Sequence, residues 1–115
     1  TLNRIRSLYE GNEQKRIMST LGDNLRGIIN QTLVKSLDGK SRFAVREILK
    51  VDFKIRKLIQ EDKLSEIRKL QEETKSTMEH KLLECYEMDK CSLEEARDKS
   101  PDVSYFDYLY EHEEI

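Results

Sequence analysis

The chain has 115 residues, of which 38% are charged and 37% hydrophobic, and its formal net charge is −2. This length suits one compact domain with a modest core and is too short for two. No apolar run approaches the length of a membrane span and no signal peptide precedes the first expected helix, so we expect no insertion into a membrane.

Charge is unevenly distributed along the chain. Residues 102–115 contain five acidic side chains and no Lys or Arg, which leaves +3 on the remainder. Basic residues cluster near positions 54–57, but acidic residues interrupt them from position 61 onwards. A nucleic-acid-binding protein usually presents a clustered basic face. We therefore expect a solvated mixed-charge surface and no nucleic-acid partner.

The first part of the chain predicts two helices that each bury one side. Leu2, Ile5 and Leu8 recur with helical spacing. We expect Asn12 to cap the second helix by accepting a backbone N–H of its first turn, and Gly27 to end it.

A hairpin follows, and the rest of the chain is organised around it. Asp38-Gly39 predicts a tight turn in which both residues take positive φ, with Ile28–Leu37 and Arg42–Val51 as the arms. An isolated hairpin is marginally stable, so the arms must pack against helices or extend a larger sheet. The apolar residues expected to form a buried pair of strands are Leu33, Val34, Phe43, Val45, Ile48 and Leu49.

A third helix is expected after Asp52, which can cap its first turn. Ile55, Leu58 and Ile59 form its narrow apolar stripe. Arg56 lies off this stripe and away from the helix ends, so its guanidinium should be available to a partner. The alternative is an ordinary surface arginine paired with a carboxylate.

Three more helical segments are expected before residue 101. The first runs roughly from Lys63 to Glu73, and the second follows a cap at Ser76-Thr77. The third begins at a capping box in which Ser92 and Glu95 satisfy each other's backbone donors, and it ends before Pro101.

The last segment, Asp102–Ile115, combines acidic and aromatic residues. Two interpretations stay open: a terminal helix that docks on its own domain, or a hook for a partner protein. The aromatic residues of this possible partner-binding tail are Tyr105, Phe106, Tyr108 and Tyr110.

The sequence contains no recognisable catalytic equipment. Its four glycines do not form a GxxxxGK[ST] loop that could bind phosphates. Cys85 and Cys91 stand six positions apart, and neither histidine has zinc-ligand spacing with them, so we expect reduced thiols. We assign no catalytic residue, no cofactor-binding residue and no metal site to this chain.

Several short motifs follow one another in order. Residues 1–14 resemble a TxDRIxxxFPxEEQ stretch, residues 25–49 contain LRG, DGK and EIL, and residues 55–59 (IRKLI) resemble an AIRNLI signature. Thr77-Met78 resembles the end of a GMQTMD-like segment, and residues 92–96 (SLEEA) resemble an SxEEA-type helix start. Together they resemble the C-terminal part of the type IV pilus retraction ATPases, the PilT-type members of the bacterial secretion ATPase family. The resemblance covers about the first hundred residues.

The resemblance implies an α+β, mostly helical fold. It implies the C-terminal portion of a RecA-like ATPase domain, with a β-hairpin followed by a helical subdomain. Residues 1–51 would be the end of the RecA-like core, with two helices and the hairpin. Residues 52–101 would form the helical C-terminal subdomain, and residues 102–115 an acidic aromatic tail beyond the resemblance.

The resemblance also implies a role for the third helix. By position, Ile55, Arg56, Leu58 and Ile59 would belong to the signature helix that couples nucleotide state to pilus retraction. The signature departs from the family pattern in being more basic, because lysines occupy positions 54 and 57.

The function implied is that of a longer protein. Members of the family form cytoplasmic hexamers, peripheral to the inner membrane, that act with pilus base proteins and use ATP and magnesium to retract the pilus in twitching motility. This chain lacks the phosphate-binding loop, so we expect no ATPase activity from it alone. The alternative is a stand-alone helical protein-interaction module that uses its acidic aromatic tail.

Overall fold

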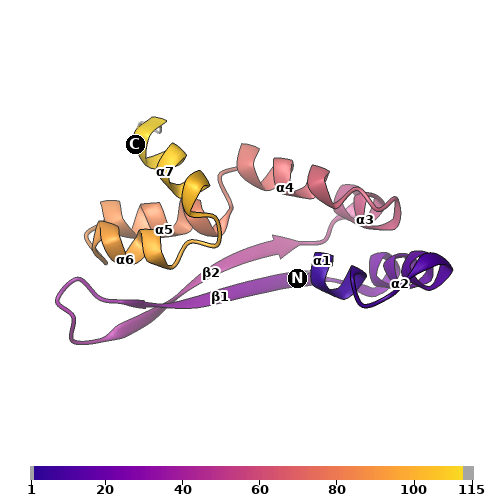
Figure 1. Ribbon diagram of the computed structural model, residues 1–115, viewed down its shortest axis with the longest axis horizontal. Helices are drawn as coiled ribbons and strands as arrows, with labels where there is room; N and C mark the ends of the chain where they lie inside the picture. Colours follow the sequence, from indigo (N-terminus) through magenta and orange to yellow (C-terminus); the bar gives the residue numbers. More distant parts are fainter. Residues whose placement is uncertain (1, 113–115) are drawn as a thin grey trace. The chain divides into compact units, whose positions relative to one another are not determined.

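Figure 1 shows the computed structural model of the chain, which describes residues 2–112. The predicted α+β, mostly helical architecture with one hairpin is confirmed. No helix in this range is both long and apolar enough to cross a membrane. The elements in chain order are α1 (Leu2–Arg6), α2 (Gly11–Asn24), β1 (Gly27–Lys35), β2 (Arg42–Lys50), α3 (Phe53–Gln60), α4 (Leu64–Glu73), α5 (Met78–Glu87), α6 (Leu93–Asp98) and α7 (Val103–His112).

The described chain divides into two compact units. The first contains residues 2–28 and 48–74, and the second contains residues 29–47 and 75–112. Both strands contribute residues to both units, so this division falls within the hairpin and not at the expected boundaries after residues 51 and 101. The assignment of a RecA-like core, a helical subdomain and a tail stays a prediction.

The core of the first unit is formed by apolar side chains of its helices and of the residue after β2. Glu10 precedes α2 and makes no side-chain capping bond, so the predicted Asn12 cap is wrong and Asn12 lies in the first turn. Gly27 does not end α2 but begins β1. The buried residues of this core are Leu2, Met18, Val51, Ile55, Ile59 and Ile67.

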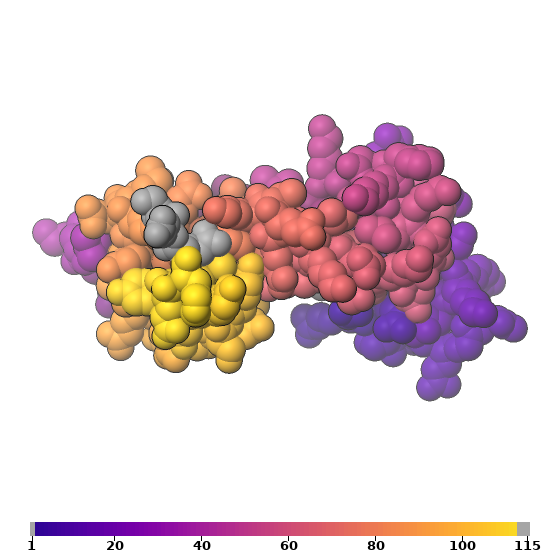
Figure 2. Space-filling model, turned by 90° about the horizontal axis from the view of Figure 1, so that it is seen from above, coloured from indigo at the N-terminus to yellow at the C-terminus, as the bar shows by residue number. Residues whose placement is uncertain are grey.

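The second unit packs helices onto one face of its part of the hairpin. Figure 1 shows α5, α6 and α7 on the same side of these strands, and Figure 2 shows the yellow α7 beside the orange α5 and α6. The buried residues of this core are Val34, Val45, Met78, Leu82, Leu83, Cys91, Ala96, Phe106 and Leu109.

Only one face of the hairpin is buried. Successive side chains of a strand point to opposite faces. Val34 and Val45 are 0% and 6% exposed, whereas Leu33 and Ile48 are 52% and 59% exposed. The prediction that all the apolar strand residues form a buried pair is therefore wrong for Leu33 and Ile48, because the helices cover a single face.

The turn of the hairpin is longer than predicted. The Gly39 N–H donates to Ser36 O (2.9 Å), and the Ser36 N–H donates to Ser41 O (2.9 Å), so four residues connect the paired ends. Of the central pair only Gly39 takes a positive φ, +75°. Asp38 uses its side chain instead: Oδ1 accepts from Ser36 Oγ (2.6 Å) and from Lys40 N (2.9 Å). These bonds, chiefly the one from Ser36 Oγ, hold the pKa of the Asp38 carboxyl below its usual value.

Three predicted helix caps are present. The side chains of Asp52, Thr77 and Ser92 accept N–H groups of the first turns of α3, α5 and α6 at 2.9, 3.2 and 3.1 Å. The reciprocal half of the Ser92 capping box is absent. The Glu95 carboxylate accepts the N–H of Lys35, the last residue of β1, at 2.7 Å instead.

Glu95 is one of three glutamates that join segments of the second unit. Glu47 Oε2 accepts the N–H of the first residue of α5 (2.8 Å), and Glu79 Oε2 accepts the N–H directly before α7 (3.0 Å). Glu47 and Glu79 are 8% and 0% exposed. Hydrogen bonds to a charged acceptor are stronger than neutral ones, so these carboxylates hold strand and helix ends in place.

Candidate coupling helix

The predicted signature helix, α3, buries its apolar side in the first unit. Ile55 and Ile59 lie one turn apart and are 5% and 0% exposed, and Leu58 is half-buried. The bond from Ile55 N to Asp52 Oδ1 satisfies one of the free donors of the first turn. The predicted apolar stripe and its cap are confirmed, whereas the coupling role stays a prediction.

α3 lies against α2 at a glycine. A Cβ at Gly22 would collide with Cγ of Gln60, so any larger residue at position 22 would force the Gln60 side chain to move. Gln60 Nε2 donates to Asp23 Oδ1 (2.8 Å), and Arg56 Nε donates to Gly22 O (2.8 Å). We expected the Arg56 guanidinium to be available to a partner, but it is half-buried and bonded to the backbone of α2 through Nε. These bonds hold α2 and α3 together as one piece.

The other side of α3 is basic and aromatic. Phe53 is 71% exposed, and Lys57 Nζ lies 5.4 Å from the centre of its ring. A lysine ammonium at this distance is attracted by the face of the ring. Lys54 is exposed as well. The positions at which the signature departs from the family pattern therefore lie on the surface.

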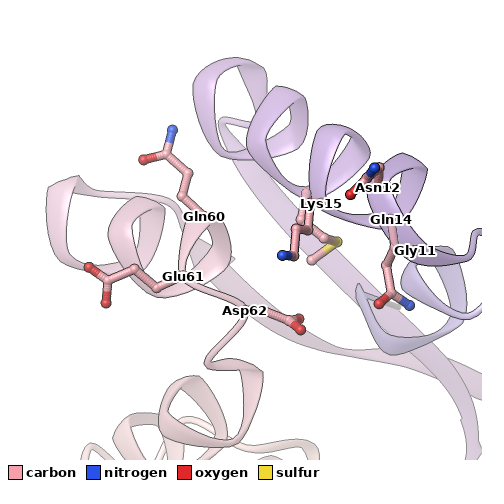
Figure 3. A pocket seen from close by; sticks show the side chains of 8 residues that line it. Gly11, Asn12, Gln14, Lys15, Gln60, Glu61 and Asp62 are labelled. Carbon is pink, nitrogen blue, oxygen red and sulfur yellow. The ribbon is translucent and has the colours of Figure 1, made fainter.

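A hollow of about 420 Å³ lies between the start of α2 and the end of α3 (Figure 3). The Lys15 ammonium and the carboxylates of Glu61 and Asp62 border it with opposite charges, and Asp62 Oδ1 lies 2.7 Å from Arg6 Nε. The hollow is lined by Gly11, Asn12, Gln14, Lys15, Met18, Gln60, Glu61 and Asp62.

α7 packs on the core of the second unit. Phe106 and Leu109 are 1% and 2% exposed. Arg97 of α6 donates twice to Asp107, from Nε to Oδ1 (2.9 Å) and from Nη2 to Oδ2 (3.0 Å). This pair holds the pKa of Asp107 below its usual value. At these residues the structure agrees with a terminal helix that docks on its own domain.

The predicted partner-binding tail is only partly at the surface. Phe106 belongs to the core and is not available to a partner, which corrects its assignment. Tyr105 is half-buried, with its ring 5.7 Å from that of His80, whereas Tyr108 and Tyr110 are 56% and 47% exposed. Residues 113–115 of the predicted tail lie outside the described residues.

The thiols and imidazoles do not form a metal site in the described chain. Cys85 and Cys91 are free, and burial raises the pKa of both thiols, that of Cys91 to about 11. The His80 Nδ1 atom lies 2.7 Å from Thr77 Oγ1. No group of three or more His, Cys, Asp or Glu side chains within residues 2–112 could hold a metal ion.

No family model matches the chain. It is 36% identical over 67 residues to a twitching motility protein of Neisseria gonorrhoeae, a match that spans 58% of this chain and 18% of that protein. It is 34% identical over 67 residues to the type IV pilus retraction ATPase PilT of Pseudomonas aeruginosa, spanning 58% and 19%. The crystal structure of the pilus retraction motor PilT with bound ADP superimposes with a TM-score of 0.81, 31% identity and coverage of 93% of this chain.

The chain is therefore similar to PilT in both sequence and fold. Its fold is that of the C-terminal part of the PilT ATPase, as the sequence motifs predicted. The chain spans about a fifth of the length of these two relatives and 30% of the PilT chain in the crystal structure. The ATPase DotB of Legionella pneumophila shares this fold, with a TM-score of 0.68, 22% identity and coverage of 84% of this chain and 27% of that one.

The sequence of this chain has no GxxxxGK[ST] loop, whose backbone N–H groups and lysine would bind phosphates. The arrangement of its residues serves to join α2 to α3 and to expose the basic aromatic side of α3.

Two features, one in each unit, were not predicted from the sequence. Gly22 does give a local signal, because a glycine inside a helix costs about 1 kcal/mol relative to alanine and is therefore often a sign of close packing. The connecting roles of Glu47 and Glu79 give no local signal, because their partners lie 31 and 23 positions away.

Proposed function

We propose that this chain is the C-terminal part of a hexameric PilT-like ATPase that retracts type IV pili in twitching motility. The observation that carries the proposal is the match to the ADP-bound retraction motor over 93% of the chain. ATP and magnesium are bound by other parts of the longer protein. That protein is cytoplasmic, lies peripheral to the inner membrane and acts on proteins of the pilus base.

In this proposal α3 transmits the conformational change that nucleotide binding produces in the longer protein. Ile55, Leu58 and Ile59 fix it to the core of its unit, and Arg56 fixes it to α2. A helix held in this way moves as a rigid body, so a shift of α2 reaches the surface of α3 without any chemistry of its own. The exposed Phe53 and the lysines beside it are the part that would contact the next component.

The reading frame and the longer protein test this proposal. The DNA upstream of the codon for Thr1 should encode a GxxxxGK[ST] loop in the same frame. The purified longer protein should form a hexamer and hydrolyse ATP. An upstream frame without such a loop, or a longer protein without ring or ATPase activity, would contradict the proposal.

A second candidate function is a protein-interaction module that uses α7. It is favoured by the exposure of Tyr108 and Tyr110, because exposed tyrosines are common at interfaces. Deleting the whole tail would also remove Phe106 from the core, so the sharper variant is Tyr108→Ser with Tyr110→Ser. Unchanged partner binding by this variant in a pull-down would exclude the interaction role.

A further inference from the structure

β2 has a backbone edge that no other strand in residues 2–112 covers. It pairs with β1 alone. Ser41 O accepts from Ser36 N, and Val51 N donates to Arg26 O, across the hairpin. Ser41 and Val51 flank β2, so the odd-numbered residues of β2 direct their backbone groups toward β1. Backbone groups alternate in an antiparallel pair, and those of Ala44 and Arg46 therefore point away from β1.

A hollow of about 190 Å³ lies at this edge, between β2 and α5 in the second unit. Four consecutive strand residues, Phe43 to Arg46, line it. Because their side chains alternate between the two faces, the hollow borders the edge of the strand and not only one face. Cys85 and the 57% exposed Met88 supply its apolar wall from the side of α5.

Within the described residues, the outward edge of β1 is closed at one point, whereas the outward edge of β2 is open. The outward N–H of Lys35 in β1 is bonded to Glu95 Oε2 at 2.7 Å. Neither a backbone nor a side-chain acceptor within the described residues bonds to the outward N–H groups of Ala44 or Arg46. Unpaired backbone groups along a strand are a template for a further strand.

The surroundings of the hollow are basic. Lys81, Lys90 and Arg46 border it with a single carboxylate, that of Glu84. The ammonium groups of Lys81 and Lys90 form no ion pair within residues 2–112, and Arg46 Nε donates to Gln31 Oε1 (3.0 Å). Charge complementarity therefore favours an acidic occupant over a neutral or basic one.

We propose that this edge binds an extended acidic peptide segment of a partner protein, which adds a third strand beside β2. Main-chain hydrogen bonds to Ala44 and Arg46 hold the segment, as in other cases of strand addition. One apolar side chain enters the hollow against Met88. Acidic side chains two positions before and after it lie on the same face of the segment, near Lys81 and Lys90.

The probe is a fluorescein-labelled peptide with a central leucine, a threonine on each side and a glutamate beyond each threonine. Its binding to the 115-residue chain is followed by fluorescence anisotropy. The double variant Lys81→Glu with Lys90→Glu should raise the Kd at least tenfold. The matched control, Lys40→Glu with Lys99→Glu, makes the same charge change at exposed positions of the second unit that do not line the hollow, and should alter the Kd less than twofold.

Methylation of successive peptide nitrogens tests the strand pairing itself. It should weaken binding at every second position only, since alternate N–H groups face β2. Absence of binding, equal effects of the two double variants, or a methylation effect without alternation would each overturn the proposal. A chain dimer that the peptide does not dissociate would overturn it too, because the edge would then belong to a second copy.

Discussion

Glu47→Ala should destabilise the second unit by about 3–6 kcal/mol. The Glu47 carboxylate is 8% exposed, and it accepts from Met78 N at 2.8 Å and from Asn30 Nδ2 at 3.0 Å. Bonds to a charged group contribute about 1.5–3 kcal/mol each, and alanine would leave both donors without this acceptor. Glu47→Gln keeps an acceptor for the N–H at the start of α5, so it should cost only about 1 kcal/mol.

Urea unfolding followed by near-ultraviolet circular dichroism measures this difference. Four of the five tyrosines lie in the second unit, so the signal reports mainly on that unit. Glu94→Ala, at an exposed position of α6, is the matched control and should change the free energy of unfolding by no more than about 0.5 kcal/mol. The reasoning is refuted if Glu47→Ala equals this control, or if glutamine is as damaging as alanine.

Three further results are expected. Gly22→Leu should lower the free energy of unfolding of the first unit by about 1–3 kcal/mol through overpacking, whereas Thr20→Leu on the exposed side of α2 should change it little; urea titration distinguishes them. Asp107→Asn should lower the melting temperature at pH 7. Since the pKa of Asp107 is lowered on folding, the wild-type chain should lose this contribution as the pH falls below about 4, and the two curves should converge there. Cys91 should react with iodoacetamide more slowly than Cys85 in the native chain at pH 8, as followed by mass spectrometry. Burial raises the pKa of the Cys91 thiol to about 11. The buried, uncharged thiol should therefore favour the folded state below pH 9, and this contribution should be lost as the pH rises toward 11.

Features of the fold that depend on neighbouring residues were predictable from the sequence. Asp52, Thr77 and Ser92 were identified as caps because each bonds to an N–H three positions ahead. Helical spacing likewise indicates the buried side of α3, because residues three or four positions apart lie on the same side of a helix. The hairpin was predicted from Asp38-Gly39, although its four-residue loop depends on side-chain bonds that the dipeptide does not specify.

Features that depend on distant contacts were not predictable. Glu95 looked like the second half of a capping box, but its carboxylate bonds to a residue 60 positions away. Arg56 looked available, because nothing in its own helix shows that α2 presents the carbonyl of Gly22 to it. Phe106 looked like part of an exposed hook, since aromatic composition does not reveal which side of α7 faces the core.

The most direct test of the coupling role uses a chimera of Pseudomonas aeruginosa PilT in which this chain replaces the corresponding segment. The chimera should form hexamers, hydrolyse ATP and support twitching, measured as the diameter of the motility zone. In the chimera, Arg56→Ala should abolish the zone while ATP hydrolysis persists, and Arg16→Ala, at an exposed position of α2, should leave both unchanged. A chimera that still twitches with Arg56→Ala would contradict the account.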